Sequence, residues 1–208
     1  MFTGIVESQA ELLAVEDRGG SRRFVLRSNL APEFKVDQSI SHDGVCLTVE
    51  DLGAGAHQEE YQVTAIPQTL ERTNLGLWQK GQRINLERSL LATSRLDGHF
   101  VQGHVDQMAS VLAVEERAGE WRYTIELAPE AAHLVVGRGS IAVNGISLTV
   151  ASIGPDQFTV AIIPYTYSNT NMSALKKGSK VNLEFDILGK YLERWISLRP
   201  GGSYSTTM

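Results

Sequence analysis

Short runs of alternating apolar and polar residues, bounded by Gly, Pro, Asn or Asp, recur along the whole chain. Phe24-Val25-Leu26 and Tyr123-Thr124-Ile125 are typical of them. Alternation with a period of two predicts short antiparallel strands with one face toward a core. One helical turn is expected after Pro67 and another after Pro164. The pattern therefore indicates a mainly β protein.

The second half of the sequence repeats the first, with an offset that changes only at short gaps. The matching blocks include Leu13-Ala14-Val15-Glu16 with Leu112-Ala113-Val114-Glu115, Leu47-Thr48-Val49 with Leu148-Thr149-Val150, and Asn85-Leu86-Glu87 with Asn182-Leu183-Glu184. Loops of different length between shared strands produce such shifts.

Each copy has room for about six strands in under a hundred residues, which fits a small closed barrel better than a sandwich. We therefore predict an all-β fold of two tandem six-stranded Greek-key β-barrels plus a C-terminal α-helix. The expected boundaries are 1–97 and 98–186 for the barrels, 187–198 for a trimerisation helix and 199–208 for a flexible tail.

Two dipeptides, Asp43-Gly44 and Asn144-Gly145, fix the register of one hairpin in each copy. Both favour a two-residue type I′ turn, because its central positions need positive φ. Counting outward pairs Ser41 with Cys46 and Ser39 with Thr48. Side chains alternate along a strand, so these four residues share one face, opposite the apolar face. The equivalent face in the second copy carries Ser140, Ala142, Ser147 and Thr149.

These two hairpin faces carry only short hydroxyl, thiol and methyl groups. A solvated strand face is one interpretation, but such faces normally carry long polar chains such as Lys and Glu. Short side chains let a flat polar ligand lie close to the backbone and form hydrogen bonds. A ligand-binding face is the interpretation that we favour.

Composition narrows the possible partners. The chain is 42% hydrophobic and has a formal net charge of -5, without a block of Lys or Arg. Nucleic acid and acidic membrane surfaces are therefore not expected partners. No apolar run reaches the roughly 18 residues of a membrane span and no leader is evident, so a cytoplasmic protein is expected. Its single cysteine, Cys46, excludes an internal disulfide and a structural zinc site built on several cysteines.

Polar residues present in only one copy are the candidates for chemistry, because residues shared by both copies are explained by the shared fold. Cys46 aligns with Ser147, His104 with Ile5, and Asp186 with Ser89, while His99 precedes the second copy. Each has a structural alternative: a small buried hydrophobe for Cys46, a structural imidazole for either histidine, and a helix N-cap for Asp186. On a regular strand, His99 and His104 would point to opposite faces, so no metal site is expected there.

The whole pattern closely resembles the riboflavin synthase family. The features that carry the resemblance are the duplication, the opening Met1-Phe2-Thr3-Gly4-Ile5-Val6-Glu7, the hairpins that end in Cys46-Leu47-Thr48-Val49 and Ser147-Leu148-Thr149-Val150, and the run from Gly98 to Asp106. The resemblance extends to about Leu198. It implies a homotrimer that dismutates two molecules of 6,7-dimethyl-8-ribityllumazine into riboflavin and 5-amino-6-ribitylaminouracil, without a metal or redox cofactor.

The resemblance also implies the site residues. Carried over from the family as catalytic are Ser39, Cys46, His104, Thr149 and Asp186. Expected to contact substrate are Gly4, Val6, Ser41, Thr48, Ala65, Thr69, His99, Gly103, Val105, Ser147, Ile163 and Thr166. We expect His104 and Thr149 to deprotonate the donor methyl group, Ser39 and Cys46 to act at C7 of the acceptor ring, and Asp186 to position ligand or water. Val45 and Asn144 depart from the commoner Cys and Asp of the family.

The resemblance places family sites between the N-terminal barrel of one subunit and the C-terminal barrel of another. We accordingly expect equivalent hairpin faces to point outward within one chain, with Cys46 and His104 on opposite sides of a shared site. The alternative function is a non-catalytic lumazine carrier of the same family. A nucleic-acid-binding barrel is a further alternative, but it needs basic residues interleaved with exposed aromatic residues, and this chain shows neither. Association with a lumazine synthase shell is left open by the sequence.

Overall fold

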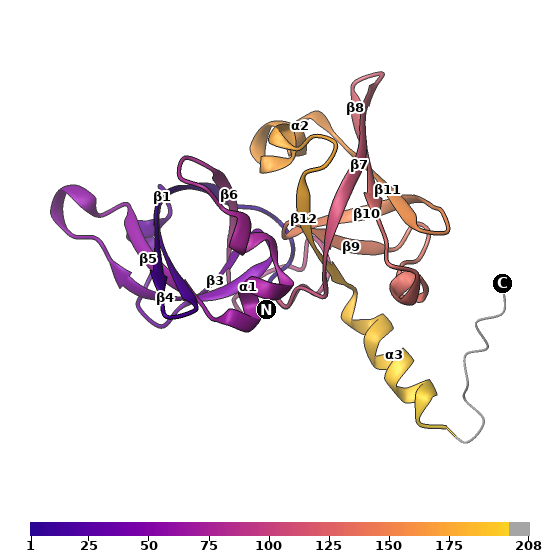
Figure 1. The fold of residues 1–208 in the computed structure, drawn as a ribbon, viewed down its shortest axis with the longest axis horizontal. Helices are drawn as coiled ribbons and strands as arrows, with labels where there is room; N and C mark the ends of the chain where they lie inside the picture. The colour runs from indigo at the N-terminus through magenta and orange to yellow at the C-terminus, as the bar shows by residue number, and fades with distance from the viewer. Residues whose placement is uncertain (200–208) are drawn as a thin grey trace.

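The computed structural model describes residues 1–199 and shows two closed antiparallel barrels of six strands each, followed by a helix (Figure 1). The predicted fold class is confirmed. The first barrel comprises β1 (Ser8–Arg18), β2 (Ser21–Arg27), β3 (Ser39–His42), β4 (Val45–Leu52), β5 (Glu60–Ala65) and β6 (Arg83–Arg88). The second comprises β7 (Gln107–Arg117), β8 (Glu120–Glu126), β9 (Ser140–Val143), β10 (Ile146–Ile153), β11 (Gln157–Ile162) and β12 (Lys180–Phe185).

The two barrels have the same strand order around their closed sheets. The first runs β1-β2-β5-β4-β3-β6, and the second has the equivalent order with β7 in place of β1 and β12 in place of β6. Both long first strands carry a register shift, between Leu12 and Ala14 and between Val111 and Ala113. Such bulges increase the local bend that closes a small barrel.

Short helical segments connect the strands at equivalent places. They are the 3-10 turns η1 (Ala31–Glu33), η2 (Gly55–His57), η3 (Asn74–Leu77), η4 (Pro129–Leu134) and η5 (Asn171–Ala174), and the helices α1 (Pro67–Arg72) and α2 (Pro164–Asn169). The expected helical turns after Pro67 and Pro164 are therefore present. Helix α3 (Ile187–Ser197) follows the second barrel. No helix within residues 1–199 has the length and apolar character needed to cross a membrane.

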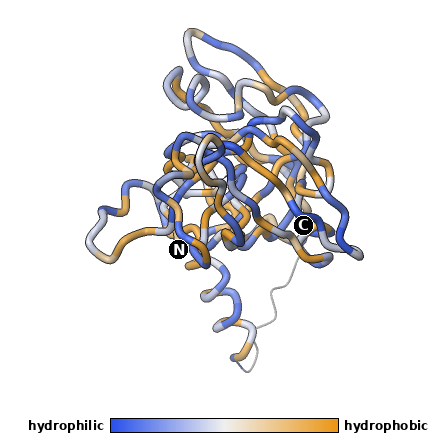
Figure 2. Tube along the Cα trace, turned by 90° about the vertical axis from the view of Figure 1, so that its left-hand side faces the viewer, coloured by the Kyte–Doolittle hydropathy of each residue, from blue (hydrophilic) through white to orange (hydrophobic). Residues whose placement is uncertain are grey.

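Each barrel has its own apolar core, built from inward residues of all its strands. Phe24, Ile40 and Tyr61 belong to the first core, and Tyr123, Ile141 and Phe158 to the second. Figure 2 shows hydrophobic and hydrophilic positions interspersed along the described residues. The predicted inward set of the first hairpin, Ile40, Leu47 and Val49, is buried in the first core.

The barrels contact each other across a buried polar cluster made of three pairs of repeat-equivalent residues. The pairs are Asp43 and Asn144, Asn74 and Asn171, and Asn85 and Asn182. Asn85 donates to the carbonyl of Asn144 at 3.0 Å, and Asn182 donates to that of Asp43 at 2.9 Å. These bonds join the barrels through side chains that both copies supply.

Helix α3 extends from the second barrel, as Figure 1 shows. Its contacts with that barrel include an ion pair of Lys190 with Asp106 at 2.5 Å. Four large apolar side chains of α3 are exposed, each more than half accessible: Leu188, Tyr191, Leu192 and Trp195. Apart from Arg199, the tail expected at 199–208 lies outside the described residues.

Candidate functional site

The two hairpins have the predicted register. Ser39 pairs with Thr48 and Ser41 with Cys46 in the first barrel, and Ala142 pairs with Ser147 in the second. Asp43 and Gly44 have φ values of 47° and 80°, and Asn144 and Gly145 have 46° and 74°. All four lie in the left-handed region that a type I′ turn requires.

Only the outer half of each small-residue face is open. In the first barrel Ser39 and Cys46 are half-buried and Thr48 is exposed, whereas Ser41 is buried. A Cβ atom on Gly145 would lie 3.4 Å from Ser41 Oγ, so the turn of the second barrel covers this hydroxyl. The second barrel repeats the pattern, with Ser140 and Ser147 half-buried, Thr149 exposed and Ala142 buried.

The turns of the two hairpins abut, so the buried end of each small-residue face lies where the barrels meet. A Cβ atom on Gly44 would lie 2.7 Å from the backbone nitrogen of Gly145. Phe2 and Val101 form an isolated antiparallel bridge and pack in one cluster with Ala142 and Cys46. The turn ends and this apolar bridge therefore occupy the space where the two barrels meet.

The chain segment before each barrel contacts the hairpin of the other barrel. Gly4 O accepts from Ser147 N at 2.7 Å, and Gly103 O accepts from Cys46 N at 2.9 Å. Beyond these glycines, Val6 packs on the core of the second barrel and Val105 on the core of the first. The lead-in segments, which are the stretches before β1 and before β7, thus cross each other between the barrels.

Glycine is required at both crossing points. Gly4 and Gly103 have φ values of 77° and 80°, and a Cβ atom on either would lie 2.6 Å from the Cβ of the facing hairpin residue. Any side chain there would both strain the backbone and push the segment off the hairpin. Close approach of these segments therefore depends on two residues without side chains.

His104 lies on the first barrel, although the sequence places it in the second copy. Its neighbours Gly103 and Val105 both contact the first barrel, and its own side chain is exposed. This placement corrects the expectation that His104 and Cys46 stand on opposite sides of a shared site. Cys46 and His104 instead lie on the same barrel of a single chain. We call the candidate residues gathered on one barrel a half-site.

His99 occupies a different place, against the hairpin of the second barrel. Its Nδ1 lies 2.7 Å from Ser147 Oγ, and its buried Nε2 has no protein partner. Burial lowers the pKa of His99, and the nearby carboxylate of Asp186 partly offsets this. A neutral imidazole beside a hydroxyl can exchange a proton with it.

The segment between the two histidines is not a regular strand, so the argument from strand alternation does not apply to it. The two imidazoles are nevertheless separated, because His99 contacts the second hairpin and His104 follows the first. Within residues 1–199 no group of three His, Cys, Asp or Glu side chains could hold a metal ion.

Asp186 has the N-cap role considered for it, and its contact with a ligand stays a prediction. Its Oδ1 accepts from Leu188 N at 3.0 Å, which makes it the N-cap of α3. It also acts electrostatically on His99, which places it near Ser147. Thr149 is two residues from Ser147 on the same strand face. His99, Ser147, Thr149 and Asp186 are therefore the candidates for a second half-site.

The remaining predicted contacts lie outside the hairpins. Ala65 is buried at the end of β5, and Thr69 is half-buried in α1. On the second barrel Ile163, just before α2, is exposed like its repeat equivalent Ile66, and Thr166 within α2 is half-buried like Thr69. That the four predicted residues contact the substrate stays a prediction.

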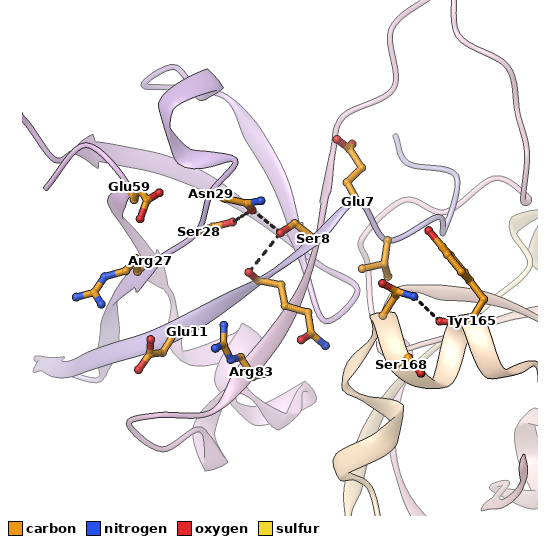
Figure 3. A pocket seen from close by; sticks show the side chains of 13 residues that line it. Glu7, Ser8, Glu11, Arg27, Ser28, Asn29, Glu59, Arg83, Tyr165 and Ser168 are labelled. Carbon is orange, nitrogen blue, oxygen red and sulfur yellow. Dashed lines mark hydrogen bonds between the residues drawn. The ribbon is translucent and has the colours of Figure 1, made fainter.

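A cavity of about 550 Å³ lies away from both hairpin faces, between the first barrel and α2 (Figure 3). Arg27, Glu59 and Arg83 line it from the first barrel, and Tyr165 and Ser168 from α2. Among the predicted substrate contacts only Val6 borders this cavity. Its mixed charges and its distance from the residues unique to one copy distinguish it from the candidate site.

Sequence-based reasoning missed the two glutamates that organise these segments. Glu87 and Glu184 are both buried, and each accepts hydrogen bonds from backbone N–H groups of a lead-in segment. Both occur in the matching Asn-Leu-Glu blocks of the repeat. Their presence in both copies is a signal in the sequence, but shared residues are explained by the shared fold and these two were not expected at the site.

Comparisons with known proteins agree with this architecture. The lumazine binding domain model matches residues 3–89 and 102–186. The riboflavin synthase of Bacillus subtilis (strain 168) is 36% identical over 197 residues, which cover 94% of this chain and 90% of that protein. The riboflavin synthase of Mycobacterium tuberculosis (strain ATCC 25618 / H37Rv) is 39% identical over 199 residues, which cover 93% of this chain and 97% of that protein.

Solved structures show the same fold. The crystal structure of LumP complexed with riboflavin has a TM-score of 0.81 at 21% identity, over 89% of this chain and 99% of that one. The LumP complex with 6,7-dimethyl-8-(1'-D-ribityl) lumazine has a TM-score of 0.79 at 20% identity, with the same coverage. Taken with the sequence matches over nearly the whole chain, the paired barrels and their two small-residue hairpin faces show that this chain belongs to the riboflavin synthase family and contains two lumazine-binding domains.

Proposed function

We propose that the chain catalyses the dismutation of two 6,7-dimethyl-8-ribityllumazine molecules, in which one donates a four-carbon unit to the other. The products are riboflavin and 5-amino-6-ribitylaminouracil. The observation that carries the proposal is the presence of two similar hairpin faces with different polar groups: Cys46 and His104 at one, His99, Ser147 and Asp186 at the other. A reaction between two copies of one substrate needs two similar binding faces that perform different chemistry.

The chemistry requires orientation and proton transfer more than a cofactor. The conjugated ring of the substrate already acidifies its 7-methyl group and accepts nucleophiles at C7. His104 and Thr149 are proposed to remove the methyl proton of the donor, and Ser39 and Cys46 to act at C7 of the acceptor. Asp186 positions ligand or water. Holding two rings in stacking geometry supplies much of the remaining rate enhancement.

The site is proposed to form between subunits. His104 belongs to the half-site of the first barrel and Thr149 to that of the second, so they can act on one methyl group only where the two half-sites meet. Within one chain, the Phe2–Val101 bridge and the abutting turns lie between the hairpins. Pairing a first barrel with the second barrel of another chain removes this obstacle.

A homotrimer would provide such pairings through a closed ring of heterologous contacts. The exposed apolar side of α3 supports this assembly, because a lone helix of eleven residues does not keep such a surface in water. We propose that α3 packs against its equivalents in the other subunits.

One assay tests the proposed reaction. Purified protein incubated with the lumazine alone should produce riboflavin, followed by its absorbance and fluorescence, without added metal or nicotinamide. Tight lumazine binding with no product between about pH 6 and pH 8 would instead indicate the non-catalytic carrier. The likeness to LumP concerns the fold and does not favour that alternative over the enzyme.

A further inference from the structure

Strand β12 carries a buried glutamate whose carboxylate accepts hydrogen bonds from three backbone N–H groups. Glu184 Oε1 accepts from Gln102 N at 2.5 Å, and Oε2 accepts from Gly103 N and His104 N, each at 2.9 Å. Burial raises the pKa of Glu184, while these hydrogen bonds act in the opposite direction. Several N–H donors on one ionised acceptor form strong, directional bonds.

Glu87 makes the equivalent arrangement on β6 of the first barrel. Its Oε1 accepts from Thr3 N at 2.6 Å and from Thr3 Oγ1 at 2.7 Å, and its Oε2 accepts from Gly4 N at 2.9 Å. Burial is again the main cause that raises the pKa of this carboxyl group. The molecule therefore contains two matched carboxylate anchors, one for each lead-in segment.

Each anchored segment continues directly into a contact with the opposite hairpin. Glu184 fixes Gly103 N, and the carbonyl of the same Gly103 accepts from Cys46 N at 2.9 Å. Glu184 also fixes the backbone of His104, the next residue. One carboxylate on the second barrel thus determines the placement of both candidate catalytic residues of the first barrel.

We infer that Glu184 is a positioning residue for Cys46 and His104, and that Glu87 does the same for Ser147 of the second half-site. The assignment rests on the proposed function for its catalytic consequence, but the anchoring itself does not. Each barrel completes the half-site of the other within one chain. A displacement of about 1 Å in a catalytic group can cost about a hundredfold in rate.

Amide hydrogen exchange tests the anchoring without any assay of activity. Glu184→Gln keeps the side-chain shape but leaves an NH₂ group facing a backbone N–H donor. We expect exchange at Cys46 N to rise at least about tenfold in this variant, while exchange at Ser147 N stays near the wild-type rate. The matched variant Glu87→Gln should give the reverse. Unchanged exchange at Cys46 N in folded Glu184→Gln would overturn the inference.

Kinetics test the consequence for the reaction. Glu184→Gln should lower kcat about tenfold to a hundredfold with KM within about threefold, because the acid/base and thiol groups shift while most ring contacts remain. In a double-mutant cycle, adding Glu184→Gln to His104→Gln should cost less than adding it to the wild type, because only the effect on Cys46 remains. Full additivity, or wild-type kcat in Glu184→Gln, would contradict a positioning role.

Two further outcomes separate this inference from the proposed function. If Cys46→Ser and His104→Gln both retain full activity, the proposed function of those residues is wrong, and the exchange experiment still decides the anchoring. If Glu184→Gln does not fold, Gly103→Ala replaces it, because its Cβ would lie 2.6 Å from Cys46 Cβ and leave the carboxylate unaltered. That variant should also raise exchange at Cys46 N and lower kcat, and failure of both changes would refute the crossing contact as the link.

Discussion

The two barrels share their strand order, their type I′ turns, their bulges and their buried glutamates, but they differ at a few polar positions on the ligand faces. Cys46 corresponds to Ser147, His104 to Ile5, and Asp186 to Ser89. The shared features each satisfy a backbone requirement, such as positive φ or a buried N–H group. The duplication thus preserved what the fold needs and left the side chains of the candidate site free to diverge.

A second lesson comes from the crossing segments. The unique histidine of copy two, His104, lies on barrel one, because Gly103 and Val105 contact that barrel. In contrast, His99 remains on barrel two, beside Ser147. Two histidines five residues apart therefore serve different half-sites.

The largest expected effect comes from removing the groups that only one copy has. Cys46→Ser and His104→Gln should each reduce turnover about a hundredfold or more while lumazine affinity, measured by fluorescence titration, changes little. The matched control is Ile5→Gln, at the position equivalent to His104, which should stay near wild-type activity. Full activity in both Cys46→Ser and His104→Gln would break the functional distinction between the barrels.

Helix α3 follows only the second barrel, so its removal tests whether this difference between the barrels supports subunit assembly. Truncation before Ile187 should convert the proposed trimer into smaller species in light scattering and lower activity strongly, because the exposed apolar side of α3 would no longer hold subunits together. The exposed pair Tyr191→Ser and Trp195→Ser provides a milder version that keeps the helix. An unchanged mass for the truncated chain would refute the role of α3.

Mixed trimers test which residues share a half-site. Chains with Cys46→Ser refolded with Asp186→Asn chains should recover up to about a quarter of wild-type activity, the share of random interfaces that unite an intact first barrel with an intact second one. Asparagine remains a good N-cap, so α3 is preserved in the second variant. Cys46→Ser with His104→Gln should recover much less, because both residues lie in one half-site of one chain. Equal recovery by the two mixtures would place His104 in the other half-site.

The smallest expected effect concerns stability at the barrel interface, where Asp43 stands opposite its repeat equivalent Asn144. Burial raises the pKa of Asp43 to about 8, and its Oδ2 has no protein partner. A carboxyl group with a raised folded-state pKa contributes stability below about pH 4 that is lost as the pH rises toward 8.

Asp43→Asn should remove this pH dependence and stabilise the protein by at least about 1 kcal/mol at pH 9, with little change at pH 4, as measured by urea unfolding. Asparagine at 144 already fills the equivalent position, so the side chain fits. The reverse variant Asn144→Asp should lower stability at high pH. A pH profile identical to that of the wild type in Asp43→Asn would show that the pKa of Asp43 is the same in the folded and unfolded states.

The sequence by itself determined the strands, the duplication, the hairpin register and the N-cap of α3. Each follows from local physics: alternation gives strands, Asp43-Gly44 and Asn144-Gly145 favour positive φ, and Asp186 precedes an apolar helical run. The identity of the candidate residues also came from the sequence, through the resemblance and the differences between copies.

Only the tertiary structure decided how those residues are grouped. Strand alternation gave no way to foresee that the segment through Gly103 leaves its own barrel and contacts Cys46, or that the second barrel covers Ser41. The tertiary structure also revealed Glu184 as the anchor of that segment. The physical reason is that these contacts join residues far apart in the chain, and they depend on buried N–H groups and close glycine packing that no local pattern encodes.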